Sequence, residues 1–477
     1  MSQVMRIAKN AVWLMIVEIM VRACAMLAVM IRARYLGPES FGVLGLAITL
    51  SALFQVIPDL GLFNILLREL SKKPEDPYFL IFQSLMMRLA MVIVSWIVLV
   101  IFLYGFSGYS ASVREFCLWN SITVLTQSWL LIFVATFQCR LEMKFVALIN
   151  ILIAIANLLL TFLLAYYKVT LFYFVILNIL YSSLLCIILG YWSKVKYHWP
   201  IGWNKIYSTK LLKDAFPLWM AGILTIIFSK IDTIFLSQLS TFESVGLYQA
   251  AVKFLEPAQS LGFAIVLSII PIYIQNMEAK KEKSKLFLES SIKALFVLGW
   301  IVVISVNLLG PYILKFCFGK NFSGSIATLK VLIDACVFSF QSAFIIQLLV
   351  YWNKQKITIL FGFLLVLFNA GINWFCIPIW HHLSAAWTAC ATEGLQLILL
   401  LWIIHRYHIM DSIKIYGVGI MLSLTLFVVL YLQSGVWQWI GLCAWIMGLI
   451  AFRMIHRDDI KNLWNVFFKR KNFVVEA

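Results

Sequence analysis

Long apolar runs separated by short polar segments repeat along nearly the whole chain. Each run extends for about 20 residues, the length that an α-helix needs to cross the hydrocarbon core of a bilayer. The apolar residues follow one another continuously, whereas a membrane barrel alternates apolar and polar side chains. The pattern therefore predicts an all-α, polytopic membrane protein with about fourteen transmembrane helices. They lie near residues 11–31, 41–57, 79–104, 116–137, 145–165, 169–191, 214–237, 244–274, 290–309, 324–351, 357–377, 383–404, 413–432 and 436–452.

The composition supports this interpretation. Hydrophobic residues make up 63% of the 477 positions and charged residues only 12%. A soluble core of this length cannot bury so many apolar groups beneath so few charges. A soluble enzyme, a disordered chain and a secreted disulfide scaffold are therefore excluded.

The charge balance adds information on topology. Lys and Arg number 38 against 21 acidic residues, a net charge of +17. In a soluble protein this excess would suggest a nucleic-acid partner. Here most basic residues fall in alternate polar segments, as the positive-inside rule predicts for cytoplasmic loops. We therefore expect both termini in the cytoplasm and no nucleic-acid partner.

The polar segments and one internal repeat divide the chain. Glu39-Ser40-x-Gly42 matches Glu243-Ser244-x-Gly246, and each copy lies between an odd-numbered predicted helix and the next even-numbered one. Repeats in the same orientation predict two pseudo-symmetric lobes of six helices around a central cavity. The predicted parts are an N-lobe at 1–191, a cytoplasmic linker at 192–213, a C-lobe at 214–404, two further helices at 405–454 and a cytoplasmic amphipathic tail at 455–477.

Metal and cofactor signals are weak. The nine cysteines contain no CxxC pair, and neither His381-His382 nor the pair His405 and His408 has nearby carboxylate or Cys ligands. No phosphate-cradling Walker A loop occurs. The sequence therefore predicts no metal site, no cofactor and no catalytic residues.

Ionisable residues within the predicted spans are the candidate functional residues, because each costs about 2.5–3.5 kcal/mol to insert. They form pairs one turn apart on a helix or stand without a neighbour of opposite charge. The pairs either fix helix packing by neutralising each other, or line a water-filled cavity in which cations bind an anion and carboxylates take H⁺ or Na⁺. The cations and acids nearly cancel, so a net cationic cavity does not follow. The cations are Arg22, Arg88, Lys253 and Lys330, and the acids are Glu18, Glu256, Asp334 and Glu393.

Two hairpin segments resemble a known family. Residues 34–42 read RYLGPESFG and are followed by PDLGL at 58–62, while Lys230-Ile-Asp232 precedes ESVGLY at 243–248. These segments resemble the polysaccharide repeat-unit flippases, the Wzx-type O-antigen and capsule translocases of the multidrug/oligosaccharidyl-lipid/polysaccharide (MOP) exporter superfamily. The motif positions are Gly37, Glu39, Gly42, Asp59, Gly61, Glu243 and Gly246.

The resemblance implies a function in the bacterial inner membrane. The implied cargo is an undecaprenyl-pyrophosphate-linked oligosaccharide, moved from the cytoplasmic to the periplasmic leaflet by ion-coupled alternating access for polysaccharide or lipopolysaccharide synthesis. Arg22 is the foremost candidate for binding the pyrophosphate, followed by Arg88, Lys253 and Lys330, with Asp334 and Glu393 as candidates for coupling to H⁺ or Na⁺. Membrane lipids, a polysaccharide polymerase and a chain-length regulator are the implied partners.

Two other functions remain open from the sequence. One is a related exporter of drugs or of another lipid-linked precursor, against which the two extra C-terminal helices count. The other is a membrane glycan polymerase or ligase, which would need a sizeable loop on the outside that the predicted topology does not provide.

Overall fold

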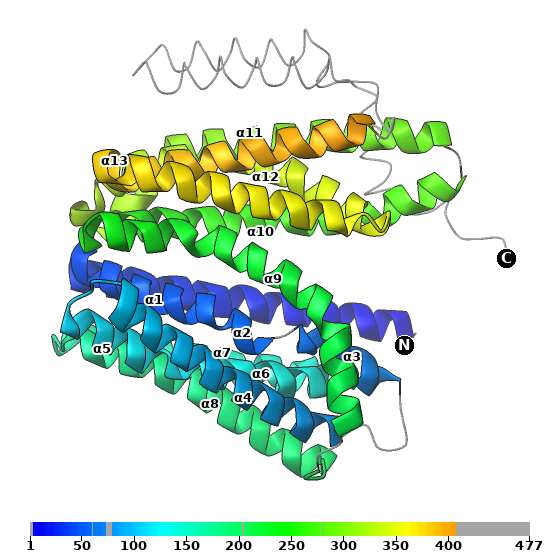
Figure 1. Ribbon diagram of the computed structural model, residues 1–477, viewed down its shortest axis with the longest axis horizontal. Helices are drawn as coiled ribbons and strands as arrows, with labels where there is room; N and C mark the ends of the chain where they lie inside the picture. The colour runs from blue at the N-terminus through cyan, green and yellow to red at the C-terminus, as the bar shows by residue number, and fades with distance from the viewer. Residues whose placement is uncertain (1–2, 60, 73–78, 203–204, 280, 407–477) are drawn as a thin grey trace, which may run out of the picture. The chain divides into compact units, whose positions relative to one another are not determined.

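The computed structural model describes residues 3–406 except 60, 73–78, 203–204 and 280 (Figure 1). The described part of the chain is helical, without strands, which confirms the predicted fold class. The predicted helices near 413–432 and 436–452 and the tail at 455–477 lie outside the described residues. The elements are α1 Gln3–Phe54, α2 Val56–Asp59, α3 Leu62–Ser71, α4 Phe79–Ile101, the π-helical η1 Phe102–Phe106, α5 Ala111–Asn120, α6 Ile122–Cys139, α7 Met143–Tyr166, α8 Leu171–Tyr197, α9 Lys205–Leu239, α10 Phe242–Ala279, α11 Lys281–Phe318, the 3₁₀ turn η2 Lys320–Phe322, α12 Ser325–Tyr351 and α13 Gln355–Arg406.

Ten segments in the described residues are long and apolar enough to cross a membrane. Two of them join two helices across a non-helical residue, Gly37 in the segment that begins with α1 and His381 in α13. The ten segments therefore account for the first twelve predicted helices. The full number of fourteen stays a prediction.

The polar segment predicted as a linker at 192–213 is mostly helical in the described residues. Helix α8 extends to Tyr197 and α9 begins at Lys205. Both helices carry lysines in these ends, and a helix satisfies its own backbone hydrogen bonds whether or not it has left the bilayer. A change from apolar to charged residues therefore marks the edge of the membrane and need not mark the end of a helix.

One helix was not predicted from the sequence. Helix α3 follows Gly61, whose φ of 63° is in the left-handed region that glycine adopts readily. Its buried side chains are spaced three and four residues apart along one face, which is the signature of an amphipathic helix. They are Leu62, Ile65, Leu66 and Leu70.

Contacts along the chain define two compact units. The first comprises Met1–Lys253, Leu309–Leu329 and Gly362–Ala389, and the second comprises Phe254–Leu308, Lys330–Phe361 and Cys390–Ala477. Their boundaries fall inside α10, α11, α12 and α13, whereas the predicted lobes at 1–191 and 214–404 follow chain order. The predicted lobe boundaries stay a prediction.

The first unit contains an apolar core between α3, α4, α6, α7 and α8. Helix α1 packs most extensively against α7, and α6 packs against α8 (Figure 1). Buried aromatic and aliphatic side chains fill the space between these helices. They include Ile81, Ile132, Phe137, Val146 and Leu189.

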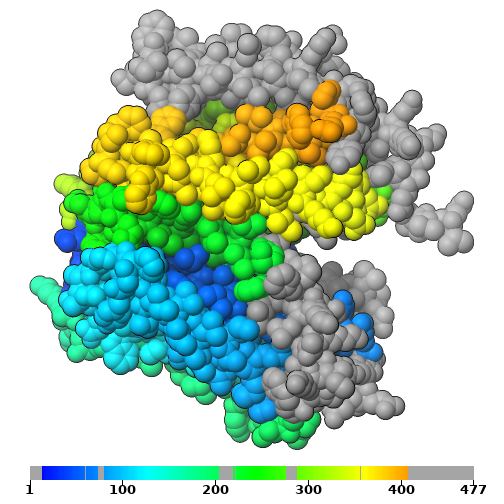
Figure 2. Space-filling view, in the orientation of Figure 1, coloured from blue at the N-terminus to red at the C-terminus, as the bar shows by residue number. Residues whose placement is uncertain are grey.

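The outer face of α4 is apolar as well. Ile93, Ile97 and Ile101, one turn apart, are about half exposed, and this part of the chain forms surface in Figure 2. Aliphatic side chains on an outward face are expected where the solvent is lipid, because hydrocarbon imposes no cost on their exposure. The burial pattern thus agrees with a multi-pass membrane protein.

Candidate functional site

The two copies of the repeated motif meet at a helix crossing in the first unit. Any side chain at Gly42 would collide with the carbonyl oxygen of Phe242, and any side chain at Gly246 would collide with the carbonyl oxygen of Pro38. Phe242 precedes Gly246 by four residues, and Pro38 precedes Gly42 by four. Each glycine therefore faces the carbonyl group of the residue four positions before the other glycine.

The other motif residues shape the two hairpins. Gly37 has φ 72° and ψ 173° and separates the two helices within α1. Glu243 lies in the first turn of α10, where the positive end of the helix dipole favours a carboxylate. The cap of α10 is Thr241, whose Oγ1 accepts a hydrogen bond from the Ser244 backbone N–H at 3.2 Å. Glu39 is exposed in the first hairpin.

Arg88 is completely buried and pairs with Asp59. Its Nη2 donates to Asp59 Oδ1 at 2.9 Å and its Nη1 donates to the carbonyl oxygen of Ser128 at 2.6 Å. These bonds join α4 to the end of α2 and to α6. In this conformation the guanidinium is therefore not accessible to a ligand. Its contacts link three helices inside the bundle.

Asp59 is the last residue of a polar face that begins near the end of α1. Ser51, Gln55 and Asp59 are spaced four residues apart, so they lie on the same side of the helix. The Ser51 hydroxyl accepts a hydrogen bond from Asn120 at 2.7 Å, and the side chains of Gln55 and Ser128 are hydrogen-bonded at 2.9 Å. This face satisfies its polar groups inside the bundle, as a low-dielectric surrounding requires.

Arg22 differs from Arg88 in being exposed. Its Nε lies 2.9 Å from Oε1 of Glu18, and 66% of the Arg22 side chain and 56% of the Glu18 side chain are accessible. The predicted local pair is therefore present, on the surface of α1. An exposed guanidinium keeps donors available for a second anion, so this position permits contact with a substrate.

The remaining predicted charges lie on α10, α12 and α13. Lys253 and Glu256 are half-buried on α10, three residues apart. On α12, Lys330 is half-buried and Asp334 is buried, with only 5% of its surface accessible. Glu393 on α13 is half-buried.

Asp334 and Glu393 form part of a cluster in the second unit. Both carboxyl groups lie close enough to the buried thiols of Cys336 and Cys390 to act on them electrostatically. The cluster joins α12 to α13, which the sequence alone did not reveal. Among the described residues, no group of three His, Cys, Asp or Glu side chains has the arrangement of a metal site.

A buried carboxylate in the first unit is a further candidate. The two oxygens of Asp232 on α9 accept hydrogen bonds from three neutral donors: Tyr248 Oη at 3.0 Å, Asn369 Nδ2 at 3.0 Å and Asn373 Nδ2 at 2.7 Å. Asp232 is only 6% exposed, and the other three side chains are buried as well. A carboxylate held by neutral groups at membrane depth is a group that a proton or a small cation can neutralise.

This Asp232 cluster brings together α9, α10 and α13. Next to it, Gln249 Nε2 donates to Thr233 Oγ1 at 3.0 Å and to Thr49 Oγ1 at 3.3 Å. In the sequence, Asp232 stands out only as part of the family motif at 230–232, which assigns it no role. The available signal is the pair of asparagines, Asn369 and Asn373, one turn apart in an otherwise apolar helix.

Comparisons with known proteins place the chain in a family. The sequence model of the polysaccharide biosynthesis protein family matches residues 7–277, more than half of the chain. A comparison with curated protein sequences finds no match.

Several solved structures have a similar fold. The lipid II flippase MurJ, in an inward closed conformation, is 17% identical with a TM-score of 0.71, covering 94% of this chain and 100% of that one. An inward-facing multidrug resistance transporter of the MATE family in the MOP superfamily is 15% identical with a TM-score of 0.63, covering 81% of this chain and 94% of that one. A MOP superfamily transporter from Pyrococcus furiosus is 16% identical with a TM-score of 0.51, covering 82% and 95% of the two chains.

At these identities the likeness establishes the fold, and the sequence match establishes the family. The chain is a multi-pass membrane protein with the MOP superfamily fold, and it belongs to the polysaccharide biosynthesis protein family.

Proposed function

We propose that this protein moves an undecaprenyl-pyrophosphate-linked oligosaccharide repeat unit from the cytoplasmic to the periplasmic leaflet of a bacterial inner membrane. Its family and its fold support a transporter of lipid-linked saccharides. O-antigen or a related surface polysaccharide is the product that the cargo would serve. The polymerase and the chain-length regulator of that polymer are the proposed partners.

The exposed guanidinium of Arg22 supports recognition of the pyrophosphate. Charge-assisted hydrogen bonds from arginine to phosphate are among the stronger polar contacts in proteins. The ion pair with Glu18 holds the Arg22 side chain in place at 2.9 Å while most of it stays accessible. Lys253 and Lys330 are proposed as additional contacts for the anion.

The Asp232 cluster is the observation that carries the ion coupling. The Asp232 carboxylate has three side chains within hydrogen-bond distance, Tyr248, Asn369 and Asn373, and these residues and Asp232 come from three helices. Protonation of Asp232, or binding of a Na⁺ ion to its carboxylate oxygens, would remove the cost of a buried negative charge. Because α9, α10 and α13 all contribute, occupancy of the site would bias how these helices pack. Asp334 and Glu393 are the second proposed coupling group.

The experiment is deletion of the gene in a strain without a redundant flippase, followed by complementation. Loss of the protein should leave repeat units on the cytoplasmic leaflet and remove the polymer from the surface. Unchanged surface polymer would refute the proposal. If the deletion strain still exported single repeat units, the protein would be a polymerase. If its drug susceptibility changed while the surface glycan stayed intact, the protein would be a drug exporter.

The ion coupling is tested with Asp232→Asn in proteoliposomes that hold a lipid-linked oligosaccharide and an imposed Na⁺ or H⁺ gradient. The variant keeps the volume of the side chain, so it should insert and fold while losing the response to the gradient. Glu115→Gln, at an exposed carboxylate of α5, is the matched control and should respond like the native protein. An unaltered response in Asp232→Asn would remove this cluster from the mechanism.

A further inference from the structure

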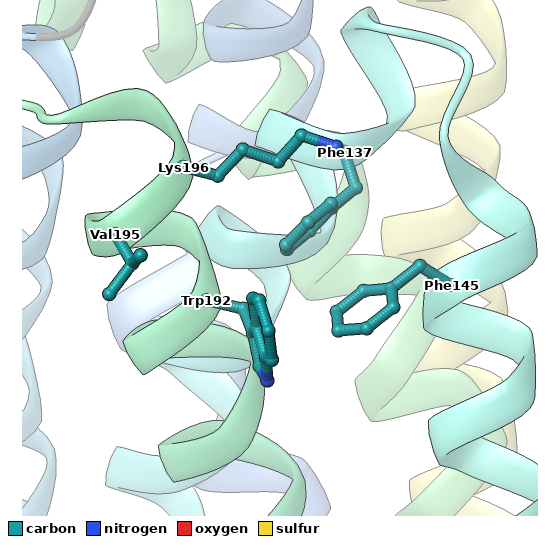
Figure 3. Close-up of a pocket in the computed structure, with 5 residues that line it drawn as sticks. All are labelled: Phe137, Phe145, Trp192, Val195 and Lys196. Carbon is teal, nitrogen blue, oxygen red and sulfur yellow. The ribbon is translucent and has the colours of Figure 1, made fainter.

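An aromatic pocket lies where α6 ends, α7 begins and α8 ends. Its volume is about 290 Å³, and its lining residues are Phe137, Phe145, Trp192, Val195 and Lys196 (Figure 3). The ring centroids of Phe137 and Phe145 are 5.5 Å apart, and those of Phe145 and Trp192 are also 5.5 Å apart. Three rings from three helices therefore form the walls.

The lining of this pocket is almost entirely apolar, and the volume is near the lower limit for small-molecule sites, which is about 300 Å³. An apolar space of this kind does not hold water, because a buried water needs two to four polar partners. Trp192 and Val195 are also exposed, at 45% and 44%, so the pocket opens to the outside of the bundle. Hydrocarbon is the medium that would enter it.

The rim of the pocket is charged. Lys196 extends across one end of the aromatic space in Figure 3, and its Nζ lies 2.6 Å from Oε2 of Glu142. The same oxygen accepts a hydrogen bond from the Tyr197 hydroxyl at 2.7 Å. An ammonium can donate three hydrogen bonds, and the contact with Glu142 uses one of them.

The surroundings of Lys196 are net positive. Arg140 and Lys144 flank Glu142 in the sequence, and Lys194 lies one turn before the end of α8 with its Nζ 4.2 Å from the ring centroid of Trp199. Lys196 and Arg140 lie near the single carboxylate of Glu142, and Lys144 and Lys194 are further cations at the same helix ends. An anionic headgroup is the ligand that this charge pattern complements.

Aromatic residues indicate the depth of the pocket. Trp192 and Tyr191 are exposed near the end of α8, as is typical of the belt where a membrane helix meets the headgroups. The positive-inside rule places this end of α8 in the cytoplasm. An acyl chain could therefore enter the pocket while its own headgroup stays at the level of the lysines.

We propose that this aromatic pocket binds one acyl chain of an anionic glycerophospholipid, with the lipid phosphate held by Lys196. The site is separate from the one proposed for the cargo, and it goes beyond the transport function. Its effect would be to anchor the ends of α6, α7 and α8 to the inner leaflet.

Native mass spectrometry of the full-length protein in detergent tests the site, with dioleoyl phosphatidylglycerol and dioleoyl phosphatidylcholine as probes. The native protein should prefer phosphatidylglycerol. Lys196→Gln should weaken the binding of phosphatidylglycerol about fivefold, which is the effect expected for one basic side chain near a headgroup. It should weaken the binding of phosphatidylcholine less, because the choline ammonium offsets the charge of the phosphate. Lys196→Arg should restore the preference.

Two matched controls separate the pocket from general surface effects. Lys144→Gln removes a neighbouring cation that does not line the pocket, and Tyr191→Ala removes an exposed aromatic beside it. Trp192→Ala should weaken the binding of both lipids, whereas Tyr191→Ala should weaken the binding of neither. Equal effects of Trp192→Ala and Tyr191→Ala, or of Lys196→Gln and Lys144→Gln, would overturn the proposal.

The competing occupant is the polyprenyl chain of the cargo. Farnesyl pyrophosphate added with phosphatidylglycerol should not displace the phospholipid from the native protein. If farnesyl pyrophosphate displaces the phospholipid from the native protein but not from Trp192→Ala, the pocket belongs to the cargo lipid instead. The thermal unfolding of each variant without added lipid shows whether it is folded before its binding is compared.

Discussion

Gly42 and Gly246 occupy equivalent positions at the crossing of α1 and α10. Each has the carbonyl oxygen of a residue on the opposite helix where its side chain would be, Phe242 for Gly42 and Pro38 for Gly246. The relationship is reciprocal because the two copies of the repeat approach each other with the same register. Small residues at such a crossing let membrane helices approach closely enough for backbone contact.

Adding a methyl group at this crossing should destabilise the protein. Gly42→Ala or Gly246→Ala forces the two backbones apart, and overpacking of this kind costs about 1–3 kcal/mol. Because either substitution separates the same pair of helices, the double variant should cost less than the sum of the single ones. Thermal unfolding of the purified protein in detergent measures all three effects.

The control for this prediction is Gly371→Ala in α13. Apart from its own stretch of helix, no atom lies within 4 Å of the position that its side chain would occupy, so alanine should be neutral or slightly stabilising there. If Gly42→Ala unfolds at the same temperature as Gly371→Ala, the crossing is looser than the structure indicates.

Arg88 and Asp59 should behave as a structural pair. Asp59→Asn leaves a completely buried guanidinium without its carboxylate, and removal of one partner of a buried pair costs about 3–5 kcal/mol. Arg88→Met should cost less, because Asp59 is 39% exposed and can be hydrated. A double-mutant cycle followed by thermal unfolding gives the coupling energy. Arg88→Met protein that unfolds normally but exports no glycan would instead assign the guanidinium to the cargo.

The membrane-spanning helices could be predicted from the sequence because a run of about 20 apolar residues has few other stable solutions in a bilayer. A local feature such as the pairing of Arg22 with Glu18 follows from spacing along one helix. The pairing of Arg88 with Asp59 joins residues 29 apart and depends on how α4 lies against α2. No periodicity contains that information.

The Asp232 cluster shows the same limit more clearly. Its asparagines are 137 and 141 residues away from the aspartate in sequence, and only the packing of α13 against α9 brings them together. A single polar residue in an apolar helix could be recognised, but its partner could not. Helix α3 was missed for a different reason, because its amphipathic pattern is short and lies within a segment rich in polar residues.

The ion pair of Glu142 and Lys196 makes the stability of the protein depend on pH. Burial alone would raise the pKa of Glu142, but hydrogen bonds from Lys196 and Tyr197 and the nearby charges lower it below its usual value of 4.5. A carboxyl whose pKa is lower in the folded state stabilises the fold above its unfolded pKa, and this contribution is lost as the pH falls through the folded pKa.

Thermal unfolding of the native protein and of Glu142→Gln should therefore differ at neutral pH and converge below about pH 4. The difference should be at most about 1 kcal/mol, because both side chains are partly exposed. Lys196→Gln should remove part of the same pH dependence. A constant difference between Glu142→Gln and the native protein across the acid range would contradict the role of this pair.

Arg22 should separate binding of the cargo from stability of the fold. Its side chain is mostly exposed, so Arg22→Ala should insert and unfold like the native protein, with a change of less than about 1 kcal/mol. Export of the repeat unit should be lost, because lysine or arginine is needed to meet the pyrophosphate, and Arg22→Lys should retain part of it as a point charge without the bidentate geometry. Surface polymer measured at matched protein levels provides the readout.

Glu18→Gln tests whether the ion pair matters, and it should reduce export less than Arg22→Ala, since it leaves the cation in place. Full export by Arg22→Ala would reduce Arg22 to a surface residue of α1 and leave Lys253 and Lys330 as the remaining candidates.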